Sequence, residues 1–198
     1  MRDENKRLVA EIYKCSDGER AEELAERLCD FYRGLAALVS ADPEYIANAM
    51  DATEGLAVLP KLLGCIASRR ITDRFKLGVA HTEAEIREYL IGVFIGIPVE
   101  SVFMLSFDGK GRAIALDFLG DGTVNASDIW PRKMVEKAVR RGAKSVVIAH
   151  NHPGGNAKPS AEDHAATNSL ASVLATSGIK LSAHYVVSGN ACTAANGS

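Results

Sequence analysis

The chain has 198 residues, of which 47% are hydrophobic and 24% are charged, and its formal net charge is −2. This balance is typical of a globular protein and excludes an intrinsically disordered chain. The sequence contains no apolar run long enough to span a membrane, and its charged N-terminus does not match a secretory signal. We therefore expect a cytoplasmic protein with no membrane partner.

The cysteines and the charges exclude two further classes of protein. Cys15, Cys29, Cys65 and Cys192 are scattered and form no CxxC pair, so we expect free thiols rather than a cysteine-based metal site. The first 98 residues carry 13 Lys and Arg against 17 Asp and Glu, and the remainder carries 10 against 8. Neither half has the basic excess that indicates a nucleic-acid-binding domain.

Helical periodicity dominates the first part of the chain. Apolar residues recur at helical spacing from Leu8 to Leu35, and Asp42-Pro43 favours another helix start, because Pro suits the first helical position. A further helix is expected from about Glu54 to Arg70, followed by a polar linker over residues 71–81. Residues 1–80 are therefore predicted to form a small all-α domain.

The second part of the chain alternates strand and helix signals. Thr82-Glu83-Ala84-Glu85 is typical of a capping box at a helix start. Strands are expected over residues 99–107, 112–118, 145–149 and 179–187, and helices over residues 131–142 and 160–177. Residues 81–198 are therefore predicted to form an α/β domain, with a small polar tail over 192–198 that is loose.

Two histidines and one aspartate form a candidate metal site. His150 ends a predicted strand, and His152 lies two residues further on, so both side chains can point to the same side. A loop rich in Pro and Gly then leads into a helix whose first turn contains Asp163. Two imidazoles and one carboxylate are a three-ligand zinc set that leaves one position open, as in catalytic sites. The pattern predicts one Zn²⁺ per chain on His150, His152 and Asp163.

Such a site indicates hydrolysis by water that the metal activates. Bound zinc lowers the pKa of water to about 7 and polarises a carbonyl group. A carboxylate that does not bind the metal must then act as general base; Glu100 is the candidate, with Asp117 and Asp121 as alternatives nearby. The hydroxyl of Ser160 is the candidate donor to the oxyanion.

At these residues the sequence resembles the JAMM (MPN+) metalloprotease superfamily, whose pattern is an upstream Glu, His-x-His, seven residues, Ser, two residues and Asp. Within this superfamily, His150-Asn151-His152-Pro153-Gly154-Gly155 and Pro159-Ser160-Ala161-Glu162-Asp163 resemble signatures of the RadC family. The segments Glu100 to Asp108 and Trp130-Pro131-Arg132 are similar to the family as well. The resemblance covers about residues 80–190.

The resemblance implies an α/β, cytidine-deaminase-like JAB/MPN fold, with a central mixed β-sheet flanked by helices and a small all-α domain before it. It also implies a zinc-dependent peptidase or isopeptidase acting on a peptide or protein substrate. In this family His150, His152 and Asp163 would be the ligands, Glu100 the acid/base and Ser160 the oxyanion stabiliser. The N-terminal helix-hairpin-helix-like region is divergent, because Glu54-Gly55-Leu56-Ala57 has one Gly where the family has Gly-x-Gly. The aromatic final strand of the family is also missing.

Other interpretations of the same residues stay open. Ser160 and Asp163 match a capping box, so Ser160 could serve as a helix N-cap instead of a catalytic residue. Glu100 could simply be a strand residue that faces solvent. His81 is expected in the linker and His164 on the surface. His184 is expected to pack in the last predicted strand or to form hydrogen bonds there. An alternative function is a non-enzymatic, DNA-repair-associated or DNA-binding protein whose contact is the basic run Arg132, Lys133, Lys137, Arg140, Arg141 and Lys144.

Overall fold

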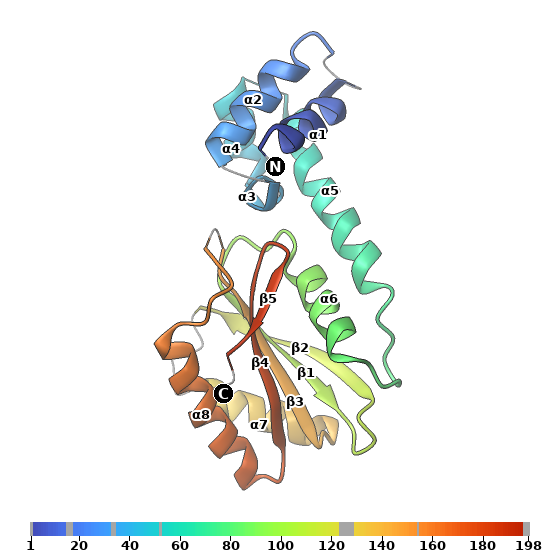
Figure 1. Ribbon diagram of the computed structural model, residues 1–198, viewed down its shortest axis with the longest axis vertical. Coiled ribbons are helices and arrows are strands. Elements are labelled where there is room, and N and C mark those ends of the chain that lie inside the picture. The colour runs from blue at the N-terminus through green and yellow to red at the C-terminus, as the bar shows by residue number, and fades with distance from the viewer. Residues whose placement is uncertain are drawn as a thin grey trace.

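The computed structural model describes residues 2–14, 18–32, 35–51, 53–122, 129–153 and 155–195. A group of helices lies at one end and an α/β unit at the other, with one long helix leading from the first to the second (Figure 1). None of the helices in these residues combines the length and the apolar character needed to cross a bilayer. Among the described residues, Cys29, Cys65 and Cys192 form no disulfide bond, whereas Cys15 lies outside them.

Five helices form the N-terminal group, and they confirm the helical pattern of the sequence. They are α1 (Arg2–Lys14), α2 (Ala21–Tyr32), α3 (Leu35–Ser40), α4 (Pro43–Met50) and α5 (Glu54–Thr72). The helix start predicted at Asp42 is confirmed, because its side chain accepts a hydrogen bond from the Glu44 amide and Pro43 opens the helix. A shared core joins these helices, centred on Tyr13, Leu24, Leu28, Leu38 and Ile46.

A proline inside α5 explains how α1 is attached to it. Pro60 has no N–H, so it cannot donate to the carbonyl oxygen of Leu56, four residues earlier. The hydroxyl of Tyr13, a side chain that is only 1% exposed, donates to this oxygen at 3.2 Å instead. The carbonyl oxygen of Leu56, which lacks its usual partner within α5, is thereby bonded to a side chain of α1.

The segment predicted to be a linker, residues 71–81, is held against the α/β unit. Gly78 N donates to Ala113 O at 2.8 Å, and Ala113 N donates to Val79 O at 2.9 Å. Phe75 stacks on the ring of His81, at 3.7 Å between centroids, and on that of Tyr89. Residues 73–81 thus connect α5 to α6, as a linker does, whereas residues 71 and 72 still belong to α5. Aromatic and backbone contacts between positions distant in sequence hold this connection in place.

In its described residues, the α/β unit has a five-stranded mixed sheet in the order β2-β1-β3-β4-β5; β3 and β4 are parallel, and the other neighbouring strands pair antiparallel. Its strands are β1 (Ser101–Phe107), β2 (Ala113–Asp121), β3 (Ser145–Asn151), β4 (Lys180–Ser188) and β5 (Ala191–Ala194). Its helices are α6 (Glu83–Phe94), α7 (Ile129–Arg141) and α8 (Ala161–Thr176). The predicted capping box at Thr82 is confirmed at the start of α6. This mixed sheet flanked by helices is the fold class that the sequence predicts.

The last strand corrects the expectation of a loose tail from Cys192 onward, although it contains no aromatic residue. Residues 191–194 pair antiparallel with β4, and Ala195 N donates to His184 O at 2.7 Å. Small residues such as Ala191 and Ala194 carry little strand propensity. Backbone pairing with β4, rather than an apolar side-chain pattern, therefore makes this strand; residues 196–198 lie outside the described chain.

Strand alternation decides which face of the sheet carries the site. The side chains of Val146 and Ile148 on β3 pack with α7 and α8, whereas Val147 and Ala149 pack with α6. Figure 1 shows the same layers, with α7 and α8 on one side of the sheet and α6 on the other. Because alternate residues share a face, His150 points to the side covered by α8.

Candidate metal centre

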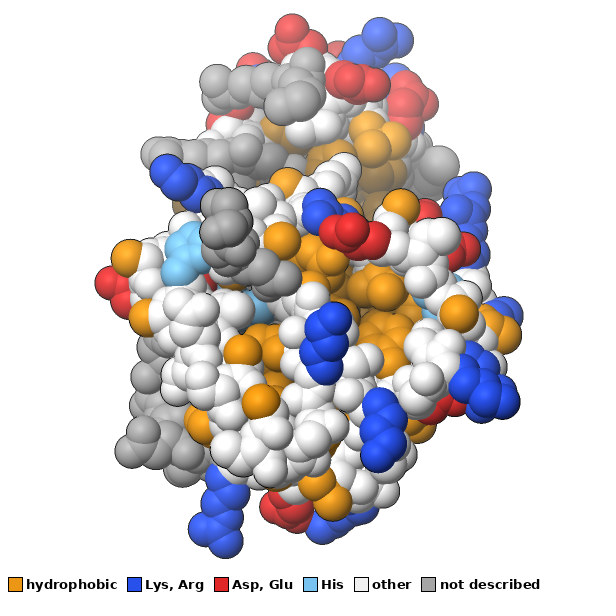
Figure 2. All heavy atoms as spheres, turned by 60° about the horizontal axis from the view of Figure 1, so that its bottom comes forward, with side chains coloured by type: hydrophobic (Ala, Val, Ile, Leu, Met, Phe, Trp, Pro, Cys, Tyr) orange, Lys and Arg blue, Asp and Glu red, His pale blue; other side chains and the backbone are white. Residues whose placement is uncertain are grey.

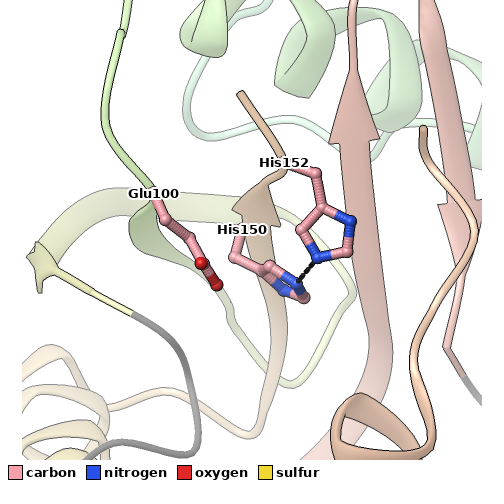
Figure 3. A group of neighbouring side chains, drawn as sticks. All are labelled: Glu100, His150 and His152. Carbon is pink, nitrogen blue, oxygen red and sulfur yellow. Dashed lines mark hydrogen bonds between the residues drawn. The ribbon is translucent and has the colours of Figure 1, made fainter. Parts of the chain in front are cut away.

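The two histidines of the motif meet at their Nε2 atoms. His150 lies within β3 and is completely buried, whereas the side chain of His152, just beyond the strand, is 25% exposed. Their Nε2 atoms are 3.1 Å apart (Figure 3). His152 N donates to Val187 O at 2.9 Å, which keeps the chain extended past the end of β3 and brings the second ring beside the first.

Asp163 reaches the same point from the first turn of α8. Ser160 is the N-cap of this helix, and the two residues form a capping box. The Asp163 Oδ2 atom accepts hydrogen bonds from Ser160 N and Ser160 Oγ, both at 2.7 Å. This leaves Oδ1, which lies 3.1 Å from His150 Nε2, while Oδ2 is 3.7 Å from His152 Nε2. The structure therefore brings together the three side chains that the sequence singles out as ligands.

The arrangement of these atoms fits a zinc ion. Zinc–nitrogen bonds of 2.0–2.1 Å in a tetrahedral site place neighbouring donor atoms roughly 3.3 Å apart. The separations of 3.1 and 3.1 Å around His150 Nε2 are close to this value. The far nitrogen of each ring also has a partner: His152 Nδ1 lies 3.0 Å from Asn156 O, and His150 Nδ1 lies 2.9 Å from His184 Nε2. Ligating histidines are held in this way, with the second ring nitrogen engaged by the protein.

Glu100 supplies a second carboxylate beside the histidines. It precedes β1 by one residue, so it lies at the edge of the strand rather than within it as expected. One of its carboxylate oxygens lies within 4.8 Å of a nitrogen of each ring, and the side chain points toward His150 (Figure 3). Burial raises the pKa of Glu100, His152 opposes this shift, and the charge of Asp163 adds to it. Within the described residues this carboxylate makes no hydrogen bond.

The alternative carboxylates are engaged elsewhere. Asp117 accepts hydrogen bonds from Arg141 on α7, at 2.8 and 3.1 Å, and pairs with Lys137. Asp121 accepts a hydrogen bond from Ser101 Oγ at 2.6 Å. Among the residues that the structure describes, neither belongs to the acidic and histidine cluster able to hold a metal. Glu100 is therefore the carboxylate other than Asp163 that faces the histidines.

Asn151 holds the Glu100 segment in place, a role that the sequence did not reveal. Its Oδ1 accepts a hydrogen bond from Ser101 N at 2.8 Å, and its Nδ2 donates to Val99 O at 3.0 Å. Asn151, the middle residue of His-x-His, thus forms hydrogen bonds with the two residues that flank Glu100. Because these contacts join positions about fifty residues apart, no local pattern signals them.

Burial keeps the inner histidines neutral. It lowers the pKa of His150 to about 4, against the opposing charge of Asp163, and that of His184 to about 3. A neutral imidazole has the lone pair that a metal requires. His184 was expected only to pack or to form hydrogen bonds, and both are confirmed; His164, expected on the surface, is exposed.

Three cations of the basic run, Lys137, Arg140 and Arg141, are paired with carboxylates. Lys137 and Arg141 both pair with Asp117, and Arg140 pairs with Glu136 one helical turn away. In Figure 2, Lys and Arg side chains are scattered over the face in view, and some of them lie beside Asp or Glu. These ion pairs offset part of the positive charge that binding to nucleic acid would require.

A family model described as a RadC-like JAB domain matches residues 80–197. The chain belongs to the RadC family. This RadC-family chain is 31% identical over 175 residues to a UPF0758 protein of Janthinobacterium sp. (strain Marseille), covering 87% of this chain and 77% of that protein. A UPF0758 protein of Polaromonas sp. is 34% identical over 175 residues, with 86% and 76% covered. The family resemblance noted in the sequence is thereby confirmed.

Proposed function

We propose that this RadC-like protein is a zinc-dependent metallohydrolase that cleaves a peptide or isopeptide bond. The convergence of His150 Nε2, His152 Nε2 and a carboxylate oxygen of Asp163 carries the proposal. These three atoms would hold the ion. When bound, zinc acts as a Lewis acid that lowers the pKa of water and polarises the scissile carbonyl.

Glu100 is the proposed general acid and base. Its carboxylate lies close enough to both histidines to form a possible metal-binding group with them. With His150, His152 and Asp163 as the proposed ligands, this carboxylate stays available for proton transfer. Its carboxylate takes a proton from the attacking water and returns a proton to the leaving nitrogen, which then departs as a neutral amine. The burial that raises its pKa favours the protonated form needed for the second step.

Ser160 has two tasks that compete for one hydrogen. Its hydroxyl donates to Asp163 Oδ2, and this bond orients the carboxylate toward the histidines. Donation to a developing oxyanion is the role proposed from the sequence, and it requires the hydroxyl to turn away from Asp163. The observed bond supports the orienting role directly.

Metal analysis of protein purified without added zinc tests the proposed site. We expect about one zinc per chain in the wild type, in line with a three-ligand site, and almost none in His152→Ala. His164→Ala is the matched control, since this exposed histidine follows Asp163 on α8 but is not part of the cluster. Equal zinc contents in all three proteins would refute the metal site.

Hydrolysis tests the proposed activity separately. The zinc-loaded wild type is incubated with linear peptides and with peptides joined through a lysine side chain, and the new amino groups are counted. We expect cleavage that a chelator abolishes and added zinc restores. A protein that holds zinc and cleaves neither class would contradict the activity while leaving the metal site in place.

A further inference from the structure

A buried chain of hydrogen bonds runs behind the candidate metal centre. His150 Nδ1 lies 2.9 Å from His184 Nε2, and His184 Nδ1 lies 2.7 Å from Thr167 Oγ1. Thr167 Oγ1 in turn donates to the carbonyl oxygen of Asp163 at 2.6 Å. All four residues are buried. The chain thus starts at one candidate ligand and ends at the backbone of another, across β3, β4 and α8.

The last bond of this chain determines the direction of all the others. A carbonyl oxygen has no hydrogen, so at 2.6 Å the hydroxyl of Thr167 must donate to Asp163 O. Thr167 Oγ1 therefore accepts from His184 Nδ1–H. A neutral imidazole carries one hydrogen, so His184 Nε2 is an acceptor and His150 Nδ1 must be the donor. The hydrogen of His150 is then on Nδ1, and its Nε2 is unprotonated.

We propose that His184 and Thr167 are positioning residues that hold His150 in the tautomer whose bare Nε2 faces the metal. The inference rests on the proposed zinc site and adds the means by which the protein prepares it. In the opposite direction, His150 would carry its hydrogen on Nε2, pointing at Asp163 Oδ1, and would have no lone pair for a metal. The same chain also ties the first turn of α8, which carries Asp163, to the rings on the sheet.

A second threonine provides a matched control for the helix-stabilising part of this contact. Thr72 Oγ1 donates to Ser68 O at 2.9 Å on α5, which is the same bond from a threonine to the carbonyl four residues earlier. The two threonines differ in that Thr167 Oγ1 also accepts a hydrogen bond from His184. Thr72→Val therefore removes a similar hydroxyl without touching the metal centre.

Zinc affinity, measured by competition with a chromophoric chelator, tests the positioning role. We expect His184→Leu to weaken zinc binding by about 10–100-fold, the range found when the partner of a ligating histidine is removed. Thr167→Val should weaken binding in the same direction, while Thr167→Ser and Thr72→Val should bind zinc as the wild type does. Circular dichroism checks that each variant is folded. Wild-type affinity in folded Thr167→Val and His184→Leu would overturn the inference.

The tautomer itself gives a readout that needs no variant. Nitrogen-15 NMR of the histidine side chains distinguishes a protonated Nδ1 from a protonated Nε2. We expect the hydrogen of His150 on Nδ1 already in metal-free wild-type protein; a hydrogen on Nε2 would overturn the inference even if the variants fail to fold. A zinc-loaded protein that hydrolyses nothing would remove the proposed activity, and the NMR result would still decide the positioning role.

Discussion

Ser160 Oγ lies 2.7 Å from Asp163 Oδ2 and accepts a hydrogen bond from Asp163 N at 3.0 Å. The carboxylate is therefore divided between two tasks, because Oδ2 closes the capping box of α8 while Oδ1 faces His150. The same side chain thus takes part in the capping box of α8 and is the proposed third metal ligand. This arrangement links the stability of α8 to the geometry of the proposed site.

Ser160→Ala should therefore lower both the stability and the zinc affinity. Loss of an N-cap hydroxyl costs about 0.5–2 kcal/mol of unfolding free energy. Thr82→Ala is the matched control, because it breaks the other capping box, at the start of α6, which contacts none of the proposed ligands. Urea unfolding and chelator competition measure the two effects. If both variants lose stability but neither loses zinc affinity, Ser160 has no role in orienting Asp163.

Glu100→Gln should keep the zinc and lose turnover. The amide has nearly the shape of the carboxylate but cannot accept the proton, so we expect the rate of hydrolysis to fall by about 10²–10⁴-fold. Zinc content and the rate of peptide cleavage are measured on the same preparation. Glu136→Gln on α7 is the control, because this exposed residue pairs with Arg140. Unchanged cleavage by Glu100→Gln would assign the proton transfer to another group.

The ion pair between Asp117 and Arg141 should make stability depend on acidic pH. Hydrogen bonds from Arg141 lower the pKa of the nearly buried Asp117 below its ordinary value of 3.8. A lowered folded-state pKa contributes stability above the unfolded-state pKa, and this contribution is lost as the pH falls through the folded-state pKa. Asp117→Asn should therefore be less stable than the wild type at neutral pH, by about 1–3 kcal/mol.

Urea unfolding across the acidic range checks this expectation. The difference between Asp117→Asn and the wild type should shrink as the pH falls below the ordinary pKa of 3.8. Glu136→Gln, which removes an exposed pair on the same helix, should show little difference at any pH. A difference that stays constant with pH would mean that Asp117 acts through packing alone.

Gly92 should be intolerant of a side chain because α6 packs closely on α5. A Cβ atom at this position would lie 2.7 Å from Cγ2 of Ile71 and 2.9 Å from its Cβ. Gly92→Ala should lower the unfolding free energy by about 1–3 kcal/mol, as overpacking does. Gly55→Ala, with no atom within 4 Å of the new Cβ, should raise it by roughly 0.5–1 kcal/mol through helix propensity. Equal changes in the two variants would contradict the close contact.

Nucleic-acid binding should be weak and should not depend on Lys137 or Arg141. Both cations are paired with Asp117, so releasing them to phosphate would first break partly buried ion pairs. Binding to a short DNA duplex is measured over a range of salt concentrations for the wild type, Lys137→Gln and Lys133→Gln. A steep salt dependence whose logarithmic slope falls by about 1 with each substitution would favour the DNA-binding alternative instead.

Local patterns determined most of the elements and the three candidate ligands. Helical periodicity, the Asp42-Pro43 start and the capping box at Thr82 depend on neighbours within one or two turns, so they can be read from the sequence. The same is true of His150 and His152, because residues two apart in an extended chain share one side. The position of Asp163 in the first turn of a helix can be predicted in the same way, from the helix start at Ser160.

Only the tertiary structure decided what surrounds these ligands. Glu100 differs from Asp117 because the fold pairs Asp117 with α7 and leaves Glu100 facing the histidines. β5 exists because β4 offers it a free edge, and the linker is ordered because β2 binds it. Thr167 has the sequence context of an ordinary helical residue. Its contact with His184 comes from packing α8 against β4, and contacts between such distant positions leave no periodic signal in the chain.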